Sequence, residues 1–286
     1  MNKIFLAILF VMSCNPVFAV DESSVEAQRL YSERDYSAQG VANAKAAAEM
    51  YGRLASGAKG SELYDLKTGE AKAFYFVGSA SKTKEEKIAF FQMGIDASKM
   101  VTKDFLPDLA DEKLDLEAEA KKVLAKHTPA EVVQLAFGLY YAGINLGSWA
   151  EANGVMQSLK KWPELRSNML VIQLLGHKEI ALFGSSRVLG RAYYKLPKIA
   201  GGDMEKAGKY LSEAFAGSTN AKGVSSNGNN NIFWAEYLNE IEKVNDAKQV
   251  LKNFIDSNLN DLDPEALPEN KNLQQIAKAI LDRWEE

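Results

Sequence analysis

The feature that most constrains the fold of this chain is the dense recurrence of apolar residues at α-helical spacing, without a convincing hairpin between alternating segments. Thr128, Pro129 and Glu131 illustrate a clear helix start, since a threonine cap, a first-position proline and an early acid all favour a helix N-terminus. Helices are predicted over 22–32, 42–54, 61–79, 85–100, 129–146, 180–196, 204–216, 231–242, 246–259 and 272–284, with another beginning at 155–160. The sequence therefore predicts an all-α chain of helical hairpins.

Small residues fall at positions where two paired helices would have to approach closely. Gly138 and Tyr141 are three residues apart, Ala150 follows Gly138 after twelve residues, and Gly190 and Tyr193 repeat the first pair. A spacing of four and then three recurs in two partner helices, over Ala207, Leu211 and Ala214 and over Ala247, Leu251 and Phe254. This pattern is typical of tetratricopeptide-like repeats, but an ordinary helical bundle with alanine at its crossings explains it equally well.

The first nineteen residues have the three regions of a signal peptide. Lys3 precedes an apolar run over residues 4–12, which is much shorter than the roughly 20 residues that span a bilayer. We expect cleavage after Ala19, which leaves residues 20–286 as a single exported helical-repeat domain. An alternative is that Val11 to Cys14 acts as a lipobox, in which case a lipid on Cys14 anchors the protein to a membrane.

Charge and cysteine content narrow the function further. The formal net charge is −4 and no basic stripe is present, so nucleic acid is not an expected partner. Cys14 is the only cysteine, and cleavage after Ala19 would remove it. The mature chain would then have no intramolecular disulfide and would depend on its hydrophobic core for stability.

The residues that usually perform catalysis are scarce. His127 and His177 are the two histidines, and each is better interpreted as a cap or loop residue than as a general base or zinc ligand. No glycine-rich phosphate loop is present. Glu22–Ser23 is a pair of the kind that lytic transglycosylases use, but the motif those enzymes place downstream is missing. We therefore expect a binding protein with no catalytic residues, no metal and no cofactor.

Aromatic residues gather between positions 138 and 240. On paired helices most of them would belong to the core, while some would line the concave groove or channel through which solenoids bind ligands. The polar residues 217–230 that interrupt this region predict a flexible, exposed linker. The candidate ligand or partner surface consists of Tyr140, Tyr141, Asn145, Trp149, Tyr193, Tyr194 and Trp234.

Residues 197–203 predict a rigid corner between two helices. Pro197 lacks an N–H and ends one helix, Gly201 and Gly202 permit a tight turn, and Asp203 caps the next helix. These four residues are therefore interpreted as structural.

Three stretches resemble a known family. The first is AGINLGSW at 142–149 leading to LKKWPEL at 159–165, the second is GSSRVLGRAYY at 184–194 followed by LPKIAGGDMEKA at 196–207, and the third is WAEY at 234–237 before LPEN at 267–270. In order and spacing they resemble the T component (TatT) of tripartite ATP-independent periplasmic transporters, across roughly residues 130–286.

The resemblance implies cryptic tetratricopeptide-like repeats, a periplasmic location and association with the substrate-binding P component of such a transporter. It also implies a homo-oligomer with a ligand-sized channel, and no catalytic residues. Many members are lipoproteins, which bears on Cys14. The expected function is thus a periplasmic transporter accessory. The alternatives are a general cell-envelope scaffold built from the same repeats and, with less support, a peptidoglycan-lytic enzyme.

Overall fold

The computed structural model describes residues 23–285. Cleavage after Ala19, lipidation of Cys14 and the carboxylate of Glu22 all concern residues outside this range. No helix among the described residues is both long enough and apolar enough to cross a membrane.

The described chain consists of helices joined by short loops, with no strand, so the prediction of an all-α fold is confirmed. Its helices are α1 (Ser24–Ser32), α2 (Ala38–Ala55), α3 (Gly60–Ala80), α4 (Lys84–Phe105), α5 (Leu116–Lys126), α6 (Pro129–Asn153), α7 (Val155–Leu174), α8 (Ile180–Lys195), α9 (Met204–Ser218), α10 (Gly228–Glu240), α11 (Val244–Ile255) and α12 (Leu267–Glu285). Short 3₁₀ turns occupy Lys198–Ala200, Leu259–Asp261 and Pro264–Ala266.

Local signals account for most of these boundaries. At the start of α6, Thr128 Oγ1 accepts a hydrogen bond from the Glu131 amide at 3.3 Å, and Glu131 Oε2 accepts one from the Thr128 amide at 2.8 Å. This reciprocal pair satisfies two amides that a helix end leaves without partners. The helix α5 was not predicted, because its segment is dominated by charged residues and alanine and buries only Ala120 and Val123 within the helix.

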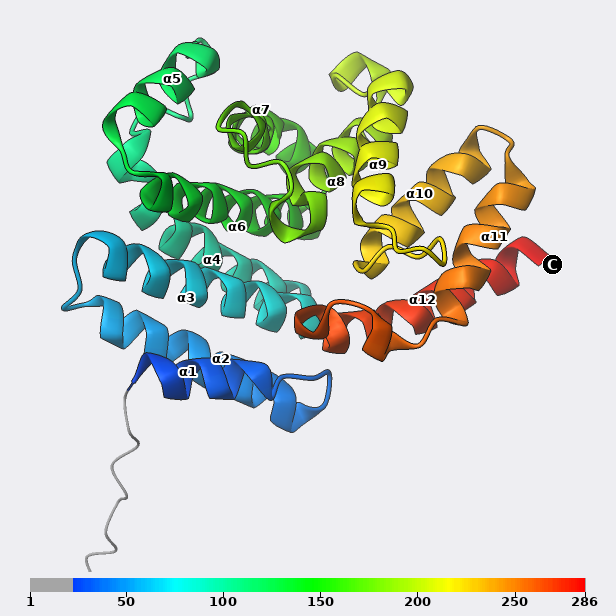
Figure 1. Cartoon of the computed structure of the whole chain (residues 1–286), viewed down its shortest axis with the longest axis horizontal. Coiled ribbons are helices and arrows are strands. Elements are labelled where there is room, and N and C mark those ends of the chain that lie inside the picture. The colour runs from blue at the N-terminus through cyan, green and yellow to red at the C-terminus, as the bar shows by residue number, and fades with distance from the viewer. Residues whose placement is uncertain (1–22, 286) are drawn as a thin grey trace, which may run out of the picture.

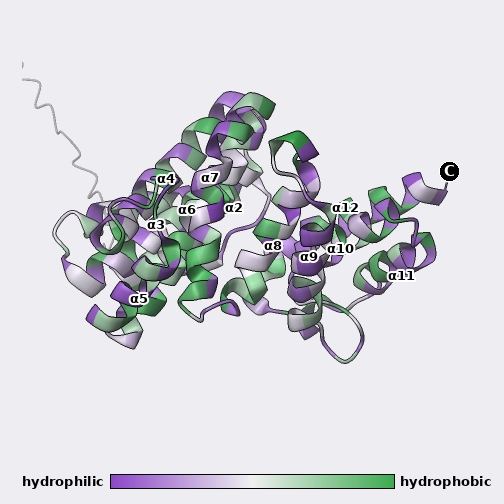
Figure 2. Ribbon diagram, turned by 90° about the horizontal axis from the view of Figure 1, so that it is seen from above, coloured by the Kyte–Doolittle hydropathy of each residue, from purple (hydrophilic) through white to green (hydrophobic). Residues whose placement is uncertain are grey.

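Successive helices pack against one another along most of the chain, and the whole path curves (Figure 1). Helices α1 to α4 and α6 form stacked layers at one end, α8 pairs with α9, and α10 pairs with α11. The chain then returns, so that the start of α12 lies beside the ends of the first helices. Hydrophobic and hydrophilic residues are interspersed along the helices (Figure 2), and in α9 and α11 the buried residues recur every three or four positions, as in amphipathic helices.

Two larger clusters of buried apolar side chains stabilise this arrangement. One spans α4 to α9 and includes Leu135, Leu139 and Met169, none of which has any exposed surface. The other joins α10, α11 and α12 around Phe254 and Ala277. Since complete burial of one such leucine or phenylalanine contributes about 2 kcal/mol, these clusters supply the main favourable contribution to folding.

Close helix crossings use small residues, although not always in the expected pairs. A Cβ on Gly190 would lie 2.7 Å from Leu211 Cγ, so this glycine does let α8 and α9 approach each other. Gly138 instead faces α4, where a Cβ on it would lie 2.8 Å from Val101 Cγ1. The helix α6 also continues to Asn153, beyond the predicted end at residue 146, and it therefore contains both Gly138 and Ala150. These two residues do not belong to the two helices of one repeat.

Candidate functional site

The curved path of the helices borders a cavity of about 950 Å³ that is partly open to solvent. Its walls come from both ends of the chain, because α1, α3, α6, α7, α8, α10 and α12 all contribute side chains to it. Apolar and aromatic residues make up much of the lining, among them Phe137, Ile144, Val188 and Phe233. Small-molecule sites in proteins typically have volumes of roughly 300–1,000 Å³ and mainly apolar walls, so this cavity has the size and character of a ligand site.

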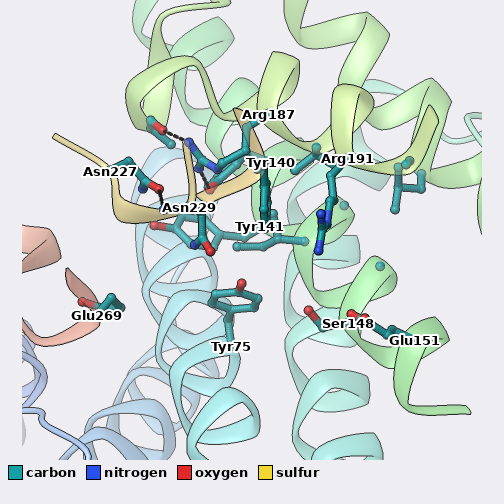
Figure 3. Close-up of a pocket in the computed structure, with 18 of the residues that line it drawn as sticks. Tyr75, Tyr140, Tyr141, Ser148, Glu151, Arg187, Arg191, Asn227, Asn229 and Glu269 are labelled. Carbon is teal, nitrogen blue, oxygen red and sulfur yellow. Dashed lines mark hydrogen bonds between the residues drawn. The ribbon is translucent and has the colours of Figure 1, made fainter. Parts of the chain in front are cut away.

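Tyrosine side chains face the interior of the cavity (Figure 3). Tyr75 comes from α3, Tyr140 and Tyr141 are adjacent on α6, and Tyr31 is on α1. Burial raises the pKa of Tyr75 to about 12 and holds the pKa values of Tyr31 and Tyr141 well above their ordinary value. These three phenols are therefore neutral at physiological pH and can act as hydrogen-bond donors to a ligand.

Arg187, on α8, is the most deeply buried charged residue of the cavity, with 5% of its surface exposed. Its Nη2 donates to Tyr140 Oη at 2.6 Å (Figure 3), and its Nη1 donates to Asn230 Oδ1 at 3.2 Å. Nη1 also donates to the carbonyl oxygens of Ala181 and Leu182, at 3.2 and 3.1 Å. The guanidinium thus fixes α6, α8 and α10 relative to one another at the cavity wall.

The backbone that Arg187 holds has an unusual conformation. Ala181, Leu182 and Phe183 all have left-handed helical angles, with φ between 50° and 59°, at the start of an otherwise right-handed α8. For L-amino acids this conformation costs about 1–2 kcal/mol per residue. The hydrogen bonds from Arg187 offset part of that cost, as does the bond from Asn230 Nδ2 to the Leu182 oxygen at 3.1 Å.

The prediction that residues 217–230 form an exposed linker holds for only part of the segment, in which Gly217, Ala221 and Lys222 are exposed, and is wrong for the rest. Ser225 has no exposed surface and Asn230 has 1%. Asn230 Nδ2 donates to Ser218 Oγ at 2.8 Å and to the carbonyl oxygen of Ala214 at 3.1 Å, while Asn231 Oδ1 accepts from the Ser225 amide at 3.0 Å. The polar composition of this segment serves internal hydrogen bonds, since buried polar groups need partners.

Polar contacts between the two ends of the chain close the cavity on another side. Arg34, which follows α1 and is buried, donates from Nε and Nη2 to both carboxylate oxygens of Glu269 on α12, each at 3.0 Å. Its Nη2 also donates to the Glu265 carbonyl oxygen, and Lys72 Nζ of α3 lies 2.7 Å from Glu265 Oε2. We call these four residues the closing contact. The hydrogen bond from Lys72 lowers the pKa of Glu265, which keeps this carboxylate ionised.

Only some of the residues predicted to form the ligand or partner surface line the cavity. Tyr140 and Tyr141 line the cavity, whereas Asn145, Trp149, Tyr193, Tyr194 and Trp234 do not belong to its lining. Asn145 is fully buried and donates to the carbonyl oxygens of Ala71 and Tyr141.

The remaining aromatic candidates pack against other rings or against the core. Tyr193 stacks on Tyr210 with ring centroids 5.9 Å apart, and Trp234 lies between Phe215 and Tyr237. Trp149 packs on the larger core cluster, and the ring of Tyr194 is covered by the Arg191 guanidinium.

Several cavity residues were not identified from the sequence. Arg34 and Glu269 are 235 positions apart in the sequence, so no local pattern predicts that they pair. Arg187 did have a signal, because it is the first charged residue after seven small or apolar residues of its predicted helix, within the second of the three stretches that resemble the transporter family.

The corner at residues 197–203 joins α8 to α9. Pro197 follows the end of α8, Gly201 has a left-handed φ of 94°, and Asp203 Oδ1 accepts hydrogen bonds from the amides of Glu205 and Lys206. A Cβ on Gly202 would lie 1.8 Å from the Leu196 carbonyl oxygen. Pro197 also lines the cavity.

The histidines lie away from the cavity lining. His127 follows the end of α5, where its ring lies 4.6 Å from that of Phe105, and His177 occupies the turn between α7 and α8. Among residues 23–285, no group of three or more His, Cys, Asp or Glu side chains has an arrangement suited to a metal ion.

No protein-family model matches the chain, and a search of curated proteins finds no significant match.

Proposed function

We propose that this protein is a periplasmic accessory (T) component of a tripartite ATP-independent transporter, which docks the substrate-binding protein and holds a small ligand. The central observation in favour is the cavity of about 950 Å³, with walls drawn from helices at both ends of the chain. A protein that served only as a scaffold would have no need to keep so large an internal space lined with tyrosines. The first two stretches that resemble the family contribute to the same cavity through Ile144, Trp162 and Arg187.

The helical arrangement fits a tetratricopeptide-like solenoid best in its second half. Helices α8 and α9 pack closely through Gly190, with Ala207 and Ala214 completely buried at their contact, and α10 and α11 form the next pair. Ala235 and Ala247 have no exposed surface either. Small residues at successive crossings are what stacked helical pairs require, so we propose that α8 to α11 are two degenerate repeats.

The partner is tested by affinity capture from a periplasmic extract. The mature chain, immobilised through its C-terminus, should retain a solute-binding protein that mass spectrometry identifies, and reverse capture with that protein should recover this one. Recovery of cell-wall assembly factors alone would favour the scaffold alternative. A peptidoglycan digestion assay with the same preparation tests the lytic alternative, and we expect no release of muropeptides.

Two further measurements test the proposed localisation and the proposed oligomeric state. Mass spectrometry of the mature N-terminus distinguishes cleavage after Ala19, which we propose, from a lipidated Cys14 that would anchor the protein in the envelope. Light scattering coupled to size-exclusion chromatography measures whether the proposed homo-oligomer forms. A monomer at micromolar concentration would contradict that part of the proposal.

A further inference from the structure

We propose that the cavity binds a carboxylate with an apolar body, and that Arg187 together with the Tyr140 hydroxyl holds the carboxylate head. This inference specifies the ligand class of the cavity on which the proposed function rests.

The first argument concerns charge. Arg187 is 5% exposed, and no carboxylate of the described chain lies within ion-pair distance of its guanidinium. Among the other cations at the cavity wall, Arg191 pairs with Glu236 and Lys161 with Glu164, while Lys195 has no ion pair within the described structure but is exposed. The closing contact likewise neutralises both of its own cations. A buried and uncompensated cation is costly, so an anion that reaches Arg187 gains a strong electrostatic interaction.

The second argument concerns free hydrogen-bond donors. A guanidinium has five N–H groups. Within the described structure, Nη1 of Arg187 donates to three oxygens and Nη2 to Tyr140 Oη, while Nε has no protein acceptor. Because Tyr140 Oη accepts the bond from Arg187, its own proton remains available for another acceptor. Two neighbouring donors, one of them charged, suit the two oxygens of a carboxylate.

The third argument concerns the rest of the cavity. The volume of about 950 Å³ far exceeds that of a carboxylate alone, and Phe137, Ile144 and Val188 line it with apolar surface. Burial of a hydrocarbon chain against such walls contributes about 0.8 kcal/mol per methylene. Three carboxylates line the cavity without an ion pair: Glu151 and Glu179, which are exposed, and the half-buried Asp263, which accepts a hydrogen bond from the Glu265 amide. None of the three forms an ion pair with Arg187. Arg187 is thus the buried cation of the described lining that lacks an ion pair, and a single buried positive charge matches a monoanion better than a phosphate dianion.

The test compares ligands of one shape and different charge on the unmodified protein. Calorimetric titration with decanoate, decan-1-ol and decyltrimethylammonium, below their micelle concentrations, should show decanoate binding at least about tenfold more tightly than the other two. Acetate, which has the head without the tail, should bind at least about tenfold more weakly than decanoate. Equal binding of the three decyl compounds would contradict the charge inference alone. The absence of binding for all of them would contradict the proposed ligand cavity itself.

Variants then assign the head group to its residues. Tyr140→Phe keeps the ring and removes one donor, so it should weaken decanoate several-fold and leave decan-1-ol unchanged. Arg187→Met should abolish the preference for decanoate over decan-1-ol. Lys198→Gln is the matched control, because it removes one exposed cation at the corner, outside the cavity lining, and should preserve the preference. If Arg187→Met does not fold, the ligand series and Tyr140→Phe decide, and an unchanged decanoate affinity in Tyr140→Phe would overturn the assignment.

Discussion

For the left-handed turn at residues 181–183, we predict that substitution by glycine favours stability. Ordinary helix propensity predicts the opposite. Ala181 has φ 50° and ψ 38°, a conformation in which the Cβ of an L-residue is crowded. Glycine has no Cβ and adopts this conformation without that penalty. Ala181→Gly should therefore recover the roughly 1–2 kcal/mol that the left-handed conformation costs, less the entropy and packing lost with the methyl group.

Ala192 provides a matched control for the same change. It lies on the right-handed part of α8, it is half-buried like Ala181, and both alanines line the cavity. The loss of a methyl group and the extra freedom of glycine in the unfolded chain affect the two variants alike. Ala192→Gly should cost about 1 kcal/mol. The difference in unfolding free energy between the two variants should then equal the left-handed penalty, about 1–2 kcal/mol in favour of Ala181→Gly.

Urea denaturation followed by circular dichroism in the far ultraviolet measures this difference. Both variants should keep the m-value of the parent protein, so that the midpoints report stability alone. An equal loss of stability in Ala181→Gly and Ala192→Gly would refute the reasoning, because it would show that position 181 carries no conformational penalty. A change in m-value for one variant would indicate an altered folded or unfolded state and would likewise count against it.

Three further perturbations test other parts of the structure. Gly202→Val should destabilise the protein by about 3 kcal/mol or more, because its Cβ would overlap a carbonyl oxygen at 1.8 Å, whereas Gly57→Val, with no heavy atom within 4 Å, should change stability by about 0.5 kcal/mol at most. Unchanged thermal stability of Gly202→Val with lost partner binding would overturn the structural interpretation of the corner. Hydrogen bonds from the α9 amides lower the pKa of Asp203, so its stabilising effect is complete above about pH 5 and is lost as the pH falls through the lowered folded-state pKa. Asp203→Asn should therefore flatten the acid limb of a stability-versus-pH curve, and an unchanged limb would exclude this cap as a contributor. Glu269→Gln should cost about 2 kcal/mol, since it weakens a bidentate pair to the buried Arg34, and hydrogen exchange should accelerate at the start of α12 before it does so in α6.

Helices with strong local signals were predictable, and those without were not. The start of α6 at Pro129 was identified correctly because its cap, proline and acid are close together in sequence. The end of α6 was placed too early, since nothing before Gly154 breaks the helix and Gly147 is accommodated inside it. The left-handed turn at the start of α8 contains no glycine that would predict it, and its carbonyl oxygens accept hydrogen bonds from Arg187 and from Asn230, which is distant in sequence. Tertiary contacts of this kind override local preference.

The candidate site was predictable only where it is local. Tyr140 and Tyr141 were found because they are adjacent aromatic residues on a strongly periodic helix. Tyr193, another candidate, is buried by stacking on Tyr210 and does not line the cavity. An aromatic residue in this region is therefore not by itself evidence of a ligand contact. Asn227, Asn229 and Asn230 lie in the segment 217–230, which was expected to be exposed because of its polar composition. For Asn230 the structure supplies the hydrogen bonds internally.

The two large apolar clusters explain why polar residues set the dimensions of the cavity. One cluster ends with α9 and the other begins with the loop before α10, so nondirectional apolar packing fixes each part separately. Much of the connection across the cavity is polar and directional: Arg187 to Asn230, Arg191 to Glu236, and Arg34 to Glu269. Directional bonds define distances more narrowly than apolar contacts do. Selection for a particular ligand could therefore act on these pairs and change the width of the cavity while both cores remain intact.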